Sequence, residues 1–117
     1  MSDIYTIDFE PSKLSHRQDE LGLEFADLDT AVELMKKEEK MIIAELTLYF
    51  SKNGGYKNIT ELNGYIYSDT KFKDYFDRYE RTLKQRNRAK IRYDSYKIFV
   101  DNLRTKIVNE RTLTKNL

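Results

Sequence analysis

The feature that most constrains the fold is a long series of apolar residues spaced alternately by four and three positions. The series reaches residue 49, and Glu39 is its one charged interruption. Its apolar members are Leu21, Phe25, Leu28, Val32, Met35, Ile42, Leu46 and Tyr49. This spacing keeps one side of a helix apolar and is typical of a left-handed coiled coil. It predicts one long helix over residues 12–52.

A second series of residues, with a seven-residue repeat, predicts another long helix over residues 69–113, starting at Ser68 and Asp69. The repeat positions are Phe72, Tyr79, Arg86, Tyr93, Val100 and Ile107, and the flanking positions are Phe76, Leu83, Tyr96 and Leu103. The flanking residues come four after the repeat early in the helix and three after it later. The apolar stripe is therefore expected to change sides between Leu83 and Tyr93.

Residues 53–68 are expected to connect the two helices. Asn53 and the two glycines that follow it favour the positive φ angles that end a helix. Next, Asn58 or Thr60 is expected to cap a short helix, with Glu61 completing a capping box from Asn58. The short helix is expected to end at Gly64.

The predicted architecture is all-α: one domain, residues 1–117, forming a long, coiled-coil-like antiparallel helical hairpin behind an extended arm over residues 1–11. A lone hairpin of this length leaves much of each apolar stripe in water, so a homo-oligomer is expected. The predicted oligomer interface consists of Leu21, Phe25, Leu28, Val32, Met35, Ile42, Leu46, Tyr93, Tyr96, Val100, Leu103 and Ile107.

Several classes of protein do not fit this composition. No apolar run approaches the roughly 20 residues of a membrane span, and the acidic first ten residues do not resemble a signal peptide, so a cytoplasmic protein is expected. The chain has no cysteine, and its single histidine, His16, lacks the spacing of a metal site. No phosphate-binding loop is present. We therefore predict no metal, no cofactor and no enzymatic activity.

Charge is divided unevenly along the chain. Residues 1–50 carry 5 basic and 12 acidic side chains, whereas residues 78–117 carry 12 basic and 4 acidic ones. Such a division indicates either an acidic helix lying antiparallel on a basic helix or a basic surface offered to a polyanion.

The densest basic run has no acidic residue within it. It contains Arg81, Lys84, Arg86, Arg88, Lys90 and Arg92. One interpretation is structural: a buried polar layer that fixes the register, or salt bridges between subunits to acidic residues such as Glu38, Glu39 or Glu45. The other is a surface for single-stranded nucleic acid, on which Tyr79, Tyr93 and Tyr96 could stack on bases. The tyrosines lie at the spacing of the apolar stripe, which favours a place in the core.

One segment resembles a known family. The segment AELTLYFSKNGGY, Ala44 to Tyr56, is similar to the stretch in phage recombination mediators of the UvsY type where a long helix ends in small, apolar and tyrosine residues before serine and glycine. The run FDRYERTLK and the tyrosine-rich second helix follow in similar places, so the resemblance covers residues 30–112. It implies a helical homo-oligomer that binds single-stranded DNA, contacts a recombinase and helps it replace the single-strand binding protein.

The chain departs from this family at one place. A family member carries basic residues just before the tyrosine-serine-glycine run, where this chain has Ile43 and Glu45. A DNA surface is therefore expected to use other residues: Arg81, Lys84, Arg86, Arg88, Lys90, Arg92, Lys52 and Lys57. The rival hypothesis is a helical adaptor that acts through protein contacts without DNA, located in the cytoplasm, or in the host cytoplasm if the chain is encoded by a phage.

Overall fold

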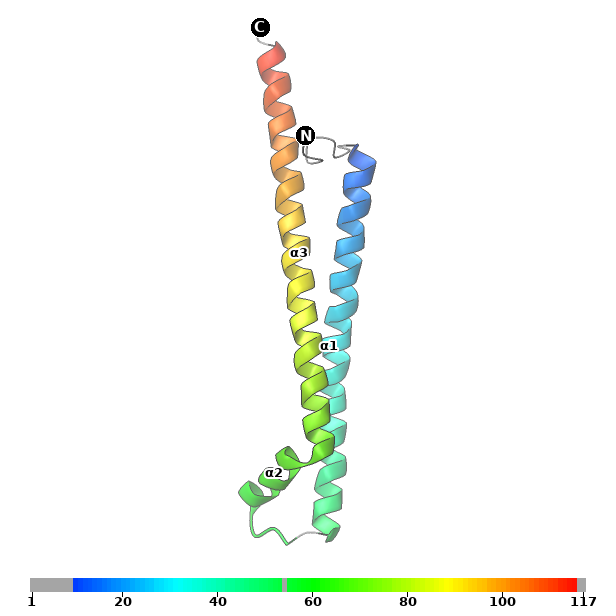
Figure 1. Cartoon of the computed structure of the whole chain (residues 1–117), viewed down its shortest axis with the longest axis vertical. Helices are drawn as coiled ribbons and strands as arrows, with labels where there is room; N and C mark the ends of the chain where they lie inside the picture. The colour runs from blue at the N-terminus through cyan, green and yellow to red at the C-terminus, as the bar shows by residue number, and fades with distance from the viewer. Residues whose placement is uncertain (1–9, 54, 116–117) are drawn as a thin grey trace, which may run out of the picture. The chain divides into compact units, whose positions relative to one another are not determined.

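The computed structural model describes residues 10–53 and 55–115, which form three helices. They are α1 (Pro11–Asn53), α2 (Ile59–Ser68) and α3 (Thr70–Lys115), as Figure 1 shows. In the described residues no strand is present, so the predicted all-α class is confirmed. The bounds of α1 and α3 lie within two residues of the predicted ones. Pro11 begins α1 and does not close an extended arm, and residues 1–9 of that arm lie outside the described residues.

Contacts divide the chain into two compact units, and α1 and α3 contribute to both. Among the described residues, the connection unit comprises 27–53 and 55–86 and includes α2, and the terminal unit comprises 10–26 and 87–115. In each unit, taken by itself, a segment of α1 runs antiparallel to a segment of α3. The predicted antiparallel hairpin with a short connecting helix is thus confirmed, while its description as one domain stays a prediction.

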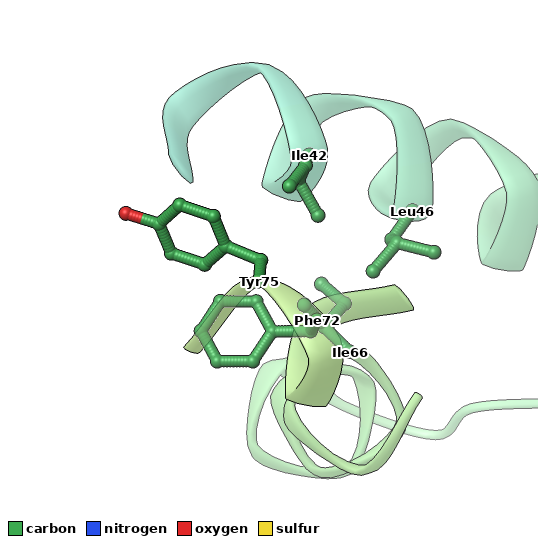
Figure 2. Packing of buried hydrophobic residues seen from close by; sticks show 5 residues of the cluster. All are labelled: Ile42, Leu46, Ile66, Phe72 and Tyr75. Carbon is green, nitrogen blue, oxygen red and sulfur yellow. The ribbon is translucent and has the colours of Figure 1, made fainter. Parts of the chain in front are cut away.

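The core of the connection unit lies where all three helices meet. Figure 2 shows Ile42 and Leu46 of α1 pointing toward Ile66, Phe72 and Tyr75, and all five side chains are buried. The side chain of Tyr75 is 1% exposed, and its hydroxyl group donates a hydrogen bond of 2.7 Å to the backbone oxygen of Met35. This bond joins α3 to α1 and gives the buried hydroxyl the partner that it needs.

In the terminal unit, Leu14 and Leu21 of α1 are buried, together with Ala89 and Val100 of α3. The ring of Tyr93 lies so close to Gly22 that a Cβ atom added there would be 3.2 Å from Cε1 of the ring. The small residue therefore lets the aromatic ring approach the backbone of α1.

The expected change of sides along the second helix is wrong. The buried positions of α3 include Tyr75 and Ala89, which come three after the repeat positions Phe72 and Arg86, whereas Phe76 is exposed. Three-residue spacing thus already applies at the start of α3. The prediction failed because the small side chain of Ala89 and the polar hydroxyl of Tyr75 made both less conspicuous than Phe76 and Leu83.

The N-cap of α2 is as predicted, but the capping box and the end of the helix are not. Oδ1 of Asn58 accepts a hydrogen bond of 2.9 Å from the backbone N–H of Glu61, so Asn58 is the N-cap. The carboxylate of Glu61 accepts the N–H of Lys57, at 3.4 Å, one residue before the cap. The helix then continues through Gly64 to Ser68, because burial of Ile66 in the last turn outweighs the cost of one glycine, about 1 kcal/mol.

The turn before α2 also differs from the expectation. Among the described residues none has a positive φ, so neither Asn53 nor Gly55 adopts the predicted conformation, and Gly54 lies outside the described residues. Asp69, in contrast, acts as expected. Its carboxylate accepts a hydrogen bond of 2.8 Å from the backbone N–H of Lys71 at the start of α3.

Gly64→Ala is expected to raise the free energy of unfolding by about 0.5–1 kcal/mol. Gly64 lies inside α2, and no atom lies within 4 Å of a Cβ added there, so alanine gains helix propensity without a clash. Urea denaturation measures the change. Gly55→Ala, at an equally open position outside the helices, is the control. A loss of stability in Gly64→Ala alone would contradict the open environment of this residue.

Candidate nucleic-acid interface

Several basic side chains of α3 are bound to acidic side chains of α1. In the connection unit the pairs are Arg78 with Glu38 at 2.7 Å, Arg86 with Asp29 at 3.0 Å, and Lys71 with Glu45; in the terminal unit Arg92 pairs with Glu24. The interpretation of an acidic helix lying on a basic one is confirmed for these residues. Two members of the predicted DNA surface, Arg86 and Arg92, therefore lie against α1.

Glu38 and Glu45 were expected to pair with the basic run of another subunit, but they pair within the chain with Arg78 and Lys71, which lie outside that run. The partners of Arg86 and Arg92, which are Asp29 and Glu24, were missed. The sequence gives each residue's helix face but not which turns of α1 and α3 lie side by side. Glu39, also expected as a partner, lies half-buried in α1. Its charge adds to the effect of burial, the larger cause, in raising the pKa of Tyr75.

Four other cations of the run are exposed, and none of them makes an ion pair with a residue that the structure describes. They are Arg81, Lys84, Arg88 and Lys90. Arg81 and Lys84 belong to the connection unit, and Arg88 and Lys90 to the terminal unit. Spacings of three and four residues along α3 place Arg81, Lys84 and Arg88 on one side of this helix. We call these three residues the basic face.

Lys90 follows Arg88 by two residues, which is roughly 200° around an α-helix, so Lys90 does not belong to the basic face. Lys52 and Lys57 are exposed near the end of α1 and just before α2. Among the described residues of the connection unit, no hydrogen bond or ion pair joins either of these lysines to Arg81 or Lys84. Of the eight predicted contact residues, three thus share one exposed helix side.

The three tyrosines that were considered for base stacking are partly buried and serve the packing of the chain. Tyr79 stacks on Tyr75 with ring centroids 6.1 Å apart, and Tyr93 stacks on Phe25 at 6.4 Å. The preference for a core role, based on their spacing, is supported by these contacts.

A groove of about 430 Å³ in the terminal unit was not found from the sequence. Its lining comprises Arg17, Leu21, Ile91, Arg92, Ser95, Tyr96 and Phe99. The exposed ring of Phe99 lies 5.9 Å from that of Tyr96, between centroids. Aromatic rings beside guanidinium groups are the combination that holds a stacked base next to a phosphate.

No family model, curated protein or solved structure matches the chain. The function is therefore argued from the residues, the geometry and the resemblance stated above.

Several of the residues predicted as an oligomer interface are buried within one chain. Leu21, Val32, Ile42, Leu46 and Val100 are buried. The partly buried ones are Phe25, Leu28, Met35, Tyr93, Tyr96, Leu103 and Ile107. Buried side chains have little surface left for a second copy. If copies of this chain associate, the five buried residues contribute little to the interface, and the role of the other seven stays a prediction.

Two further observations concern only residues 10–53 and 55–115. No group of three or more histidine, cysteine or carboxylate side chains there has the arrangement of a metal site. None of the three helices combines the length and the apolar character that crossing a bilayer requires.

Proposed function

We propose that this protein binds single-stranded DNA, without enzymatic activity, through the basic face of α3. The observation that carries the proposal is that only some residues of the basic run are ion-paired with α1. Arg86 and Arg92 are neutralised by α1, whereas Arg81, Lys84 and Arg88 make no ion pair with the described residues. Like charges three and four residues apart repel one another on a helix, and bound phosphates relieve this repulsion.

A single strand fits these features better than a duplex does. Unpaired bases can stack on exposed aromatic rings, and the groove with Phe99 offers such a ring. Every base has an aromatic face, so contacts of this kind tolerate any sequence. Binding is expected to be independent of sequence and sensitive to salt.

The resemblance to phage recombination mediators extends this proposal to a biological role. On that basis the protein loads a recombinase onto single-stranded DNA in the cytoplasm, or in the host cytoplasm if the chain is encoded by a phage. The recombinase and the single-stranded DNA are then its partners, and association with further copies is expected.

The second candidate function is that of a helical adaptor acting through protein contacts alone. A specific observation favours it: Leu34, Met41 and Leu48 recur every seven residues on α1 and are all exposed. The two functions differ in what the basic face binds, which is DNA in the first and nothing in the second.

Fluorescence anisotropy of a labelled single-stranded oligonucleotide, titrated with protein at several salt concentrations, tests the proposal. We expect binding that weakens with salt with a log–log slope of about −0.7 per phosphate neutralised. A duplex of the same length is expected to bind more weakly. No binding at low salt, by protein whose helical circular dichroism is intact, would leave the adaptor function as the better explanation.

A further inference from the structure

Leu34, Met41 and Leu48 form a second apolar row on α1, distinct from the buried series that faces α3. Their exposed fractions are 57%, 63% and 63%. Single exposed aliphatic residues are common, but a seven-residue repeat of them places all three on one side of the helix. Such an exposed apolar row is suited to packing against another helix.

One flank of the row opens into a groove of about 380 Å³ within the connection unit. Its lining comprises Met41, Ile42, Glu38, Glu45, Asp74, Lys71 and Arg78. Lys71 and Arg78 neutralise Glu45 and Glu38. Asp74 is exposed and makes no salt bridge with the described residues. The groove therefore holds one more carboxylate than cations.

The other flank of the row is basic. Lys37 and Lys40 are exposed on that side of α1, and no ion pair joins either to a residue that the structure describes. Glu33, the acidic residue nearest to them on this flank, is bound by Lys36 at 3.0 Å. The row thus has lysines on one side and a groove with an excess carboxylate on the other.

We propose that a second copy of this chain docks on this row, with the two α1 helices parallel and in register. The two flanks determine the orientation. In a parallel pair related by a twofold axis along α1, the basic flank of each copy meets the acidic groove of the other, and the interface is self-complementary. In an antiparallel pair the basic flank of one copy faces the basic flank of the other, so Lys37 and Lys40 approach the same lysines of the second copy. Charge complementarity therefore favours the parallel pair.

This inference goes beyond the proposed function and does not depend on DNA binding. It places the association of copies on the outer side of α1, because the buried series is used between α1 and α3 of one chain. The residues concerned all belong to the connection unit.

Single cysteine substitutions test the orientation, since the chain contains no cysteine. Leu34→Cys, Met41→Cys and Leu48→Cys are made separately and oxidised under mild conditions. In a parallel, in-register pair each position lies opposite itself, so all three variants are expected to form disulfide-linked dimers. An antiparallel pair brings at most one of the three positions opposite itself. Disulfide formation at one position only, or at none, would overturn the proposal.

The matched control is Lys36→Cys. Lys36 is exposed and lies five residues before Met41, roughly 140° away around the helix, so its cysteine is expected to stay reduced. Cross-linking of Lys36→Cys as fast as that of the three row variants would indicate random collisions and overturn the proposal.

Sedimentation equilibrium tests the association itself. The wild-type protein is expected to have at least twice the 14.0 kDa mass of one chain, and Met41→Glu is expected to raise the dissociation constant at least tenfold. Met41 is exposed, so its substitution leaves the helical circular dichroism unchanged. A wild-type protein that stays monomeric at micromolar concentrations, or unaltered association of Met41→Glu, would overturn the proposal. Neither measurement uses DNA, so failure here is distinguishable from failure of the proposed function.

Discussion

Replacing Arg81, Lys84 and Arg88 together by glutamine is expected to weaken binding of single-stranded DNA by about 10- to 100-fold at low salt. The three side chains are exposed and free of salt bridges to the described residues, so each can neutralise one phosphate. Since each phosphate contact to a single strand contributes about 0.7 to the salt dependence, the log–log slope is expected to fall by about 2. Anisotropy titrations at several salt concentrations measure both quantities.

The matched control removes the same charge from exposed positions of α3 outside the basic face. It combines Lys90→Gln, Arg104→Gln and Arg111→Gln, which all lie roughly 140–200° around α3 from Arg88. This variant is expected to bind almost as tightly as the wild-type protein, because its basic face is intact. Equal losses of affinity in both triple variants would show that net charge governs binding, and that the basic face has no special role.

The hydroxyl group of Tyr75 is expected to make the protein less stable as the pH rises from about 10 to 12. Burial, with a smaller contribution from the charge of Glu39, raises the pKa of Tyr75 from 10.0 to about 12. Between these values the folded chain keeps a proton that the unfolded chain has lost. This contribution to stability is thus fully present below pH 10, and up to about 2 kcal/mol of it is lost by pH 12.

Tyr75→Phe isolates this effect from the titration of other groups. The variant also lacks the hydrogen bond to Met35, so below pH 10 it is expected to be less stable than the wild-type protein by about 1 kcal/mol. As the pH rises, the wild-type protein loses its advantage and the two stabilities approach each other. Urea denaturation at pH 9 and pH 11 measures the difference, and Tyr67→Phe, at an exposed side chain, is the control. A difference that is the same at both pH values would contradict the proposed role of the buried hydroxyl.

The long helices could be predicted because their signal is repeated many times. The four-three spacing from Leu21 to Leu46 gave α1, and a single weak position such as Glu39 did not alter it. Details that depend on one residue were less predictable. Gly64 lies inside α2 because of the burial of Ile66, which is a tertiary effect that local propensity does not contain.

The location of the candidate site could be predicted from the sequence. Which of its basic side chains pair with α1 and which stay exposed could not. Charge counts identified the basic run, and helical spacing alone separates Arg81 and Arg88 from Arg86. Which of these sides meets α1 depends on how the two helices pack, as the contact between Arg86 and Asp29 shows. The exposed row of Leu34, Met41 and Leu48 was also present in the sequence. It was overlooked because the longer apolar series that faces α3 dominated the pattern.

The most direct test of the central claim is lysine acetylation of the wild-type protein with and without saturating single-stranded DNA, followed by mass spectrometry. Lys84 is the one lysine of the basic face, while Lys90 and Lys97 are exposed on other sides of α3. If phosphates lie along the basic face, DNA protects Lys84 and leaves Lys90 and Lys97 as reactive as before. Equal reactivity of Lys84 in both samples, or protection of Lys90 in its place, would contradict the account.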